Sequence, residues 1–207
     1  MPINSLNPRV HLASRSPRRR LLLQQIGVRF DTIVFREAPR FDPEVDETPL
    51  ADEAPAVYVE RLARAKAMHG WRIVGWHRLQ KQPVLAADTT LELDGRIFGK
   101  PVDAADAESI LRMLSGKSHR VLTAVAVAFE SRLESALSIS EVRFAPIDDA
   151  EIRHYVETGE PMDKAGAYAI QGRAGIYVEH LSGSYSGVMG LPLHETAELL
   201  KRFDFPI

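Results

Sequence analysis

The chain has 207 residues, of which 45% are hydrophobic, enough to bury a core as one domain or as two small lobes sharing a sheet. It has no cysteine, which excludes disulfides and thiolate zinc sites and favours a reducing compartment, so we predict a cytoplasmic protein. The net charge is -2 and the longest apolar runs fall short of the ~20 residues of a membrane span, so neither nucleic acid nor a membrane is an expected partner.

Apolar runs alternate with helical patterns along the chain, an order typical of an α/β protein. The first half predicts a strand at residues 10–13, a helix at 17–25 that begins on Pro17 and ends at Gly27, a strand at 30–35, a long acidic loop at 36–54, a helix at 55–68 and a buried strand at 84–87. Irregular backbone is expected between that helix and the buried strand.

The second half begins with a strong hairpin signal at Asp94-Gly95. It then predicts a helix at 104–114 that ends at Gly116, long strands at 120–129 and 137–144, a helix to Thr158 capped by Asp148 or Asp149, a glycine-rich segment at 182–190 and a final helix at 193–202. The glycines at 182–190 are most simply interpreted as turns.

Arginines crowd the start of the first predicted helix, in Ser14-Arg15-Ser16-Pro17-Arg18-Arg19-Arg20. The helix macrodipole already makes this end positive, so acidic residues would normally be preferred there. One interpretation is a solvated basic face. The other is a bound polyphosphate, because helix N–H groups, serine hydroxyls and guanidinium groups all donate to the same anion.

Asp88 directly follows the apolar run at 84–87, with Thr89 beside it. Its carboxylate is therefore expected at the end of a buried strand, where open α/β sheets usually bind ligands. The alternative is that Asp88 only caps a turn. Lys66, late in the 55–68 helix, and Lys100, in Gly99-Lys100-Pro101, stand at the ends of other elements, although each alone is typical of a surface lysine.

A series of short motifs resembles the Maf family of nucleotide pyrophosphatases and spans nearly the whole chain. The segment Leu12-Ala13-Ser14-Arg15-Ser16-Pro17-Arg18-Arg19 closely resembles the N-terminal signature of that family. The other matches follow in the right order: RLARAKA at 61–67, Ala87-Asp88-Thr89, Gly99-Lys100-Pro101, Leu114-Ser115-Gly116 with His119, DKAGAYAIQG at 163–172, Gly183-Ser184-Tyr185 and Gly190-Leu191-Pro192-Leu193.

The resemblance implies a single domain over residues 1–207 with a mixed twisted sheet flanked by helices and two lobes around a central active-site cleft, as in Maf and ITPase-like proteins. It also implies that a nucleoside triphosphate is cleaved between its α and β phosphates with a divalent metal, Mg²⁺ or Mn²⁺. Ile170-Gln171-Gly172 is similar to the branch that hydrolyses dTTP and UTP, whereas the 7-methyl-GTP branch differs there.

Roles for single residues follow from the same resemblance. Asp88 matches the general base. Arg18, Thr89 and Gln171 match positions tied to substrate choice, and the phosphate-binding positions are Ser14, Arg19, Lys66 and Lys100. The metal is expected on Asp88 and on a loop glutamate. The acidic loop is longer than in the family, so more than one carboxylate can match that position. We assign it to Glu47, with Asp46 and Glu44 as rivals.

Other functions stay open at this point. One is a pyrophosphatase for 7-methyl-GTP or another non-standard nucleotide. Another is a nucleotide-binding regulator of cell division or septum formation without turnover, an association that the family name carries. The sequence also leaves open whether the chain forms a homodimer.

Overall fold

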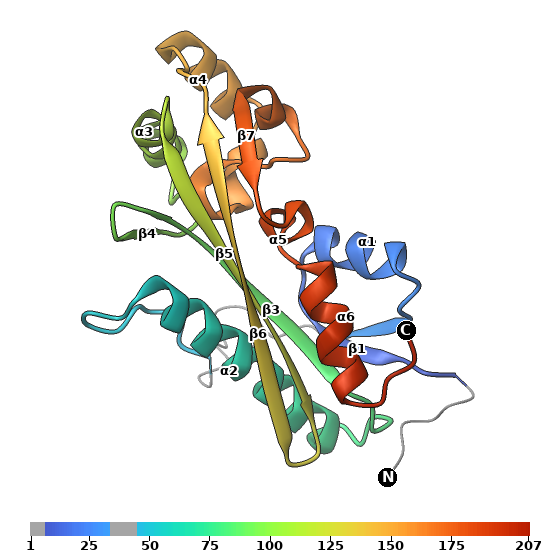
Figure 1. The fold of residues 1–207 in the computed structure, drawn as a ribbon. Coiled ribbons are helices and arrows are strands. Elements are labelled where there is room, and N and C mark those ends of the chain that lie inside the picture. Colours follow the sequence, from blue (N-terminus) through green and yellow to red (C-terminus); the bar gives the residue numbers. More distant parts are fainter. Residues whose placement is uncertain (1–6, 34–44) are drawn as a thin grey trace.

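The computed structural model describes residues 7–33 and 45–207, which form one sheet of seven strands with helices around it (Figure 1). The strands are β1 (Val10–Ala13), β2 (Phe30–Ile33), β3 (Val84–Leu93), β4 (Arg96–Phe98), β5 (Ser118–Phe129), β6 (Arg132–Phe144) and β7 (Val178–Ser182). The helices are α1 (Pro17–Gln25), α2 (Pro55–Trp76), α3 (Ala104–Leu114), α4 (Asp149–Glu157), α5 (Tyr185–Met189) and α6 (Leu193–Arg202), with short 3₁₀ helices η1 (Glu160–Asp163), η2 (Ala165–Ala167) and η3 (Arg173–Tyr177). None of the helices in these two ranges combines the length and the apolar character of a membrane span.

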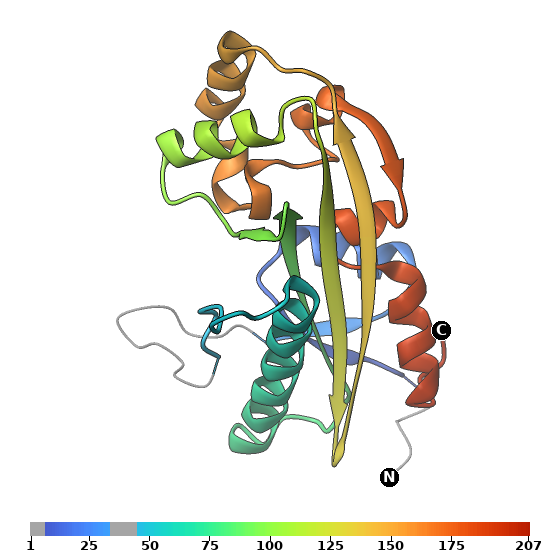
Figure 2. The same cartoon turned by 60° about the vertical axis from the view of Figure 1, so that its left-hand side comes forward.

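The sheet is mixed, with strand order β2-β1-β3-β5-β6-β7 and β4 paired to the end of β3. Strand β1 pairs in parallel with β2 and with the start of β3. The strands β3, β5, β6 and β7 are antiparallel to one another along this order, and the long β5 and β6 connect the two ends of the molecule (Figure 2). The predicted fold class, α/β with a mixed twisted sheet flanked by helices, is therefore confirmed.

Alternate residues of a strand face opposite sides of its sheet, and β3 uses both sides. Ala86 belongs to a buried cluster that includes Ala63 of α2. Its neighbour Ala87 belongs to another, with Leu23 of α1 and Leu200 of α6. Helix α2 thus covers one face of this part of the sheet, and α1 and α6 cover the other.

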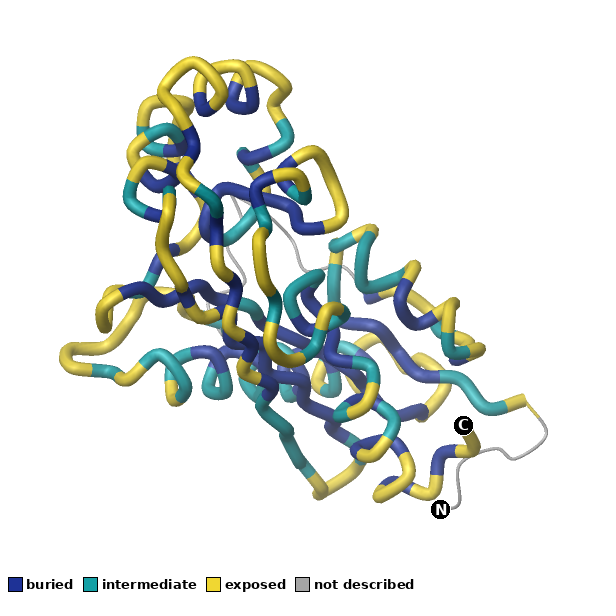
Figure 3. Tube along the Cα trace, turned by 45° about the horizontal axis from the view of Figure 1, so that its top comes forward, coloured by how far each residue is buried: buried dark blue, intermediate teal, exposed yellow. Residues whose placement is uncertain are grey.

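A third buried cluster lies at the far end of β5 and β6, where α3, α4 and the 3₁₀ helices pack together. Figures 1 and 2 show these elements at one end of the molecule and α1, α2 and α6 at the other. Figure 3 shows the buried residues concentrated along the strands between them. This arrangement matches the two lobes that the resemblance implies.

Helix α2 is longer than predicted, because it continues through Gly70 to Trp76 instead of ending at Met68. Gly70 lies where the helix touches the sheet. A Cβ atom there would be 2.7 Å from Val84 Cγ1. The close packing that glycine permits outweighs its low helix propensity, and for this reason the expected irregular stretch is helical.

Strand β3 also extends further than predicted, to Leu93. Asp88 therefore lies within the strand and not at its end, so that prediction was wrong. The polar run that starts at Asp88 resembles a strand end in the sequence, but its backbone keeps pairing with β5 up to Glu92.

The other boundaries agree more closely with the sequence. Helices α1, α3, α4 and α6, the Asp94-Gly95 hairpin and the Asp148 cap, which forms a capping box with Glu151, are confirmed. Strands β5 and β6 both start earlier than expected. Strand β2 ends at Ile33 among the described residues, and the rest of the predicted strand, 34–35, lies outside them. No element is predicted over 178–189, where β7 and α5 form.

Candidate active site

A cleft of about 650 Å³ opens between the two groups of helices. Its walls come from the β1–α1 loop and the start of α1, from α2, from the middle of β3, and from segments 99–100, 163–171 and 188–190. Every site residue that the sequence predicts lines it, and these are Ser14, Arg18, Arg19, Glu47, Lys66, Asp88, Thr89, Lys100 and Gln171.

The cleft follows from a gap along one edge of β3. The pairing of β3 with β1 stops at Leu85, and its pairing with β4 starts only at Leu91. Its other edge pairs with β5 throughout this stretch. The backbone of residues 86–90 therefore has no strand partner on the cleft side among the described residues, and this opening places Asp88 beside a ligand-sized space.

Asp88 and Thr89 point to opposite faces of the sheet, as neighbours in a strand must. On the α2 face, Asp88 reaches Lys66. On the α1 face, Thr89 reaches Arg19. One strand thus joins an acidic centre on one side to a cationic wall on the other.

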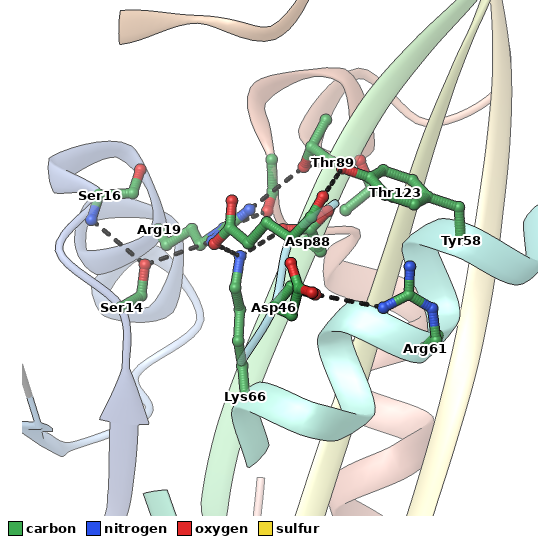
Figure 4. Close-up of polar contacts among 12 residues, drawn as sticks. Ser14, Ser16, Arg19, Asp46, Tyr58, Arg61, Lys66, Asp88, Thr89 and Thr123 are labelled. Atoms are coloured by element: carbon green, nitrogen blue, oxygen red, sulfur yellow. Dashed lines mark hydrogen bonds and ion pairs between the residues drawn. The ribbon is translucent and has the colours of Figure 1, made fainter. Parts of the chain in front are cut away.

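The ammonium group of Lys66 lies between two carboxylates (Figure 4). Its Nζ atom is 2.6 Å from Asp88 Oδ1 and 2.7 Å from Glu47 Oε1. Burial alone would raise the pKa of Glu47, but Lys66, with smaller contributions from Lys100 and Arg19, outweighs burial and holds that pKa below its ordinary value. Glu47 is therefore ionised at neutral pH.

Arg19 is held from three directions (Figure 4). Its Nε donates to Gly190 O at 2.7 Å, Nη1 to Ser14 Oγ at 3.3 Å and Nη2 to Thr89 Oγ1 at 3.2 Å. Burial lowers the pKa of Arg19, with Asp88 acting in the opposite direction, but a guanidinium remains charged at neutral pH. Nη1 and Nη2 each carry a second N–H that can be directed to a ligand.

Thr89 is fixed by a chain of hydroxyl groups that continues to Thr123. Thr123 Oγ1 lies 2.7 Å from Gly187 O, which can only accept, and 3.1 Å from Thr89 Oγ1. Because a hydroxyl carries a single hydrogen, Thr123 donates to Gly187 and Thr89 donates to Thr123. Thr89 therefore faces the cleft as an acceptor.

Further residues reach the cleft from other walls. Arg18 donates from Nε to Met189 O at 3.3 Å, and its Nη1 lies 3.8 Å from Asp163 Oδ2. Lys100 and Gln171 are exposed side chains that line the cleft, after β4 and after η2 respectively. Residues tied by resemblance to phosphate binding and to substrate choice thus share one space.

The rivals for the loop carboxylate differ in position. The Asp46 carboxylate accepts a hydrogen bond from Thr48 N at 2.8 Å, and Asp46 does not line the cleft. Glu44 lies outside the described residues. Glu47 is thus the described loop carboxylate that reaches Lys66.

Some residues that line the cleft are not predicted as site residues from the sequence, namely Tyr58, Lys164 and the backbone at 188–190. The glycine-rich spacing of 183–190 is the signal available for the last of these. The spacing favours turns, and the structure adds that Gly190 provides the carbonyl that holds Arg19.

The side chains that could hold a metal are Asp88 and Glu47. Among residues 7–33 and 45–207, no group of three or more His, Cys, Asp or Glu side chains could bind an ion without further ligands. Mg²⁺ in nucleotide enzymes is usually bound by one or two carboxylates together with substrate phosphates and water. Two carboxylates that already flank one cation, the Lys66 ammonium, fit an ion of that kind.

The Maf-like protein family matches residues 9–203, and these include every site residue described above. The chain belongs to the Maf family. Proteins called dTTP/UTP pyrophosphatase are similar to this Maf chain over nearly their whole length. The one from Dechloromonas aromatica is 65% identical, covering 95% of this chain and 98% of that protein. The one from Aromatoleum aromaticum is 61% identical, covering 98% of each.

Among solved structures, the Staphylococcus aureus Ham1 protein aligns with this Maf chain at a TM-score of 0.48 and 15% identity, covering 94% of this chain and 97% of that one. A likeness at that distance bears on neither the activity nor the site.

Proposed function

We propose that this Maf-family chain hydrolyses dTTP and UTP between the α and β phosphates, giving the nucleoside monophosphate and pyrophosphate, with Mg²⁺ or Mn²⁺ bound by Asp88 and Glu47. The observation that carries the proposal is the pair of carboxylates around Lys66, beside a cationic wall in one cleft. The name of the relatives at 65% and 61% identity supports the same substrates.

The cationic wall suits a triphosphate. Helix α1 begins at the cleft with Pro17 and has no acidic residue in its first turn, so its positive end faces the space. Three hydrogen bonds hold the Arg19 guanidinium group in place, and its remaining N–H groups can donate to phosphate oxygens. Lys100 adds a flexible charge. Each charge-assisted hydrogen bond of this kind contributes roughly 1.5 to 3 kcal/mol.

To hydrolyse a phosphoanhydride, the protein mainly has to position the nucleotide and the attacking water and to neutralise the charge of the phosphates. Asp88 accepts the proton of a water molecule whose oxygen bonds to the α phosphorus. The bond from that phosphorus to the bridging oxygen breaks, and pyrophosphate leaves with the electron pair. Lys66, Arg19 and Lys100 hold the phosphate oxygens in line, and a bound metal ion would neutralise their growing charge.

The base is selected by the wall of the cleft that carries Gln171. The side-chain amide of Gln171 offers a donor and an acceptor, which match the alternating N–H and carbonyl edge of uracil and thymine. Arg18 also approaches this wall, because its guanidinium group contacts Asp163. Thr89 contributes an acceptor from the sheet.

A nucleotide panel tests the proposal. Purified protein is given dTTP, UTP, CTP, modified pyrimidine triphosphates, 7-methyl-GTP and GTP with Mg²⁺ or Mn²⁺, and released pyrophosphate is measured. We expect the highest kcat/KM for dTTP and UTP. Preference for 7-methyl-GTP would move the chain to the other branch, and binding of dTTP without turnover would support a regulator instead.

A further inference from the structure

We propose that Arg61 and its partner Glu53 are positioning residues that present the Glu47 carboxylate to the cleft, so that the affinity for the metal depends on an arginine that does not itself line the cleft. This rests on the proposed function only in taking Glu47 as a metal ligand.

Arg61 and Glu53 form a two-pronged ion pair. Arg61 Nε lies 2.7 Å from Glu53 Oε1, and Nη2 lies 2.7 Å from Oε2. The Glu53 side chain is only 4% exposed. Hydrogen bonding to Arg61 lowers the pKa of Glu53 to about 2, so the pair is charged throughout the working pH range. Glu53 Oε2 also accepts from Leu50 N at 3.1 Å, which draws the loop into the same contact.

Three consecutive backbone carbonyls of the loop are held by α2. Arg61 Nη1 donates to Asp46 O at 3.2 Å, and Nη2 donates to Thr48 O at 3.1 Å. Between these two, the Tyr58 hydroxyl donates to Glu47 O at 3.0 Å. Figure 4 shows Arg61 and Tyr58 on the same side of α2, with Arg61 bonded to Asp46.

This clamp fixes the side chain of Glu47 through its backbone. The Glu47 side chain is 60% exposed and reaches Lys66 at 2.7 Å. Because the Glu47 end of this ion pair is exposed, the pair alone does little to order the loop: the entropy of holding two long side chains offsets much of its attraction. The half-buried, two-pronged Arg61–Glu53 pair and the three carbonyl bonds are therefore what fix the direction of the Glu47 carboxylate.

A competing view is that Arg61 serves only the stability of α2 and its loop. It predicts that removing Arg61 would affect unfolding but not the metal beyond that. The two views separate in a double-mutant cycle, because a residue that acts through Glu47 can have no effect once Glu47 is gone.

The experiment uses the full chain with Mn²⁺ as the probe. Mn²⁺ binding is titrated by the electron paramagnetic resonance signal of the free ion, in the presence of a non-hydrolysable dTTP analogue. The variants are Arg61→Ala, Glu53→Gln, Glu47→Gln and the double variant Glu47→Gln/Arg61→Ala. Arg64→Ala is the matched control, since Arg64 belongs to the same helix but donates to Ser135 Oγ, away from the loop.

We expect Arg61→Ala and Glu53→Gln to weaken Mn²⁺ binding about 10- to 100-fold, the usual effect of losing a residue that orients a metal ligand. Arg64→Ala should bind Mn²⁺ like the original chain. In the Glu47→Gln background, Arg61→Ala should have no further effect. Tyr58→Phe, which removes only one bond to the loop, should show the same pattern at smaller size and covers the case in which Arg61→Ala fails to fold.

Unchanged Mn²⁺ binding in Arg61→Ala, equal loss in Arg64→Ala, or additive effects of Arg61→Ala and Glu47→Gln would overturn the inference, as would absence of Mn²⁺ binding by the original chain. Pyrophosphate release is measured separately. Coupled Mn²⁺ binding without any turnover would leave the inference standing and reject the proposed function.

Discussion

Asp88 is the residue on which the proposed chemistry depends most. Its side chain is 12% exposed, and its carboxylate contacts Lys66 within a strand that is paired along its other edge. We expect Asp88→Asn to lower kcat by about 100- to 10,000-fold, since an amide cannot accept the proton of water at neutral pH. The fold should survive, because the two side chains have the same shape.

The measurement for Asp88→Asn is pyrophosphate release from dTTP beside a thermal unfolding curve. Lys66→Met is a useful comparison, because it removes the cation of the Asp88–Lys66 ion pair and leaves the carboxylate. Activity within a few-fold of the original chain would show that Asp88 is not the base.

Gln171 tests how the base is selected. Gln171→Glu removes the N–H₂ donor but leaves an acceptor of similar size, so dTTP and UTP should lose kcat/KM relative to other nucleotides. The loss should be larger than the roughly 1 to 3 kcal/mol that a single methyl group contributes to selectivity, because a carbonyl oxygen of the base would then face a carboxylate instead of the amide donor. UTP and dTTP should remain poorly separated.

Steady-state kinetics on the nucleotide panel provide the check for Gln171. Gln24→Glu, at an exposed position of α1 outside the cleft, controls for the added charge. A substrate profile unchanged from that control would assign base recognition to Arg18, Thr89 or the backbone.

The site residues that the sequence predicts all line the cleft, but the sequence could not show their contacts. Lys66 and Asp88 are 22 positions apart and come together only because α2 crosses the face of β3 to which Asp88 points. The role of Gly190 was equally hidden, since its carbonyl meets an arginine from the other end of the chain. Motifs reveal residue types in order, whereas partners depend on the tertiary packing.

At the scale of elements, the contact between α2 and the sheet depends on Gly70. A Cβ at this position would be 2.7 Å from Val84 Cγ1 and 3.2 Å from Ala13 Cβ. We therefore expect Gly70→Ala to lower the free energy of unfolding by about 1 to 3 kcal/mol, the usual cost of overpacking a core. The same helix has a matched control in Gly75, where an added Cβ meets nothing within 4 Å.

Gly75→Ala should be neutral or raise the free energy of unfolding by up to about 1 kcal/mol through helix propensity. Urea unfolding of both variants provides the comparison. Equal effects of the two substitutions would mean that α2 does not press on Val84 as the structure shows.

The elements that the sequence predicts best are those with local signals. Helix α4 has the Asp148 cap and Gly159, and the β3–β4 hairpin has Asp94-Gly95, with both residues at positive φ. The errors fall where tertiary contacts outweigh local preference, as at Gly70 in α2 and at the polar run within β3. Strand β7 gave no signal of its own, because its residues are half-buried or exposed and pair only with β6 among the described strands.

At the scale of the whole molecule, His119 makes stability depend on pH. It lies in the cluster at the far end of β5, and its Nε2 is 2.9 Å from the Tyr168 hydroxyl. Burial lowers the pKa of His119 to about 4. The folded chain therefore leaves His119 neutral between pH 4 and about 6.5, where the unfolded chain binds a proton.

The stability that His119 contributes is complete above about pH 6.5 and is lost as the pH falls towards 4, by about 3 kcal/mol in all. His119→Gln, which cannot be protonated, should flatten the pH dependence of the free energy of unfolding in that window. Urea unfolding at a series of pH values measures this slope. An identical slope in both proteins would show that His119 is not the group that titrates.

The two ends of the molecule are joined by β5 and β6, and the cleft lies between them, so α1 with Arg19 and the segment that carries Gln171 belong to different ends (Figure 1). A triphosphate whose phosphates lie against α1 would extend its base towards η2 and Gln171. Asp88 lines the cleft between the two walls, and the proposed function places cleavage beside it.

Identification of the products from dTTP tests that position most directly. With Mg²⁺ or Mn²⁺, we expect equal amounts of dTMP and pyrophosphate from the original chain, and both products at a rate lower by about 100-fold or more from Asp88→Asn. Release of dTDP and inorganic phosphate, or dTMP formation by Asp88→Asn within a few-fold of the original rate, would contradict the account.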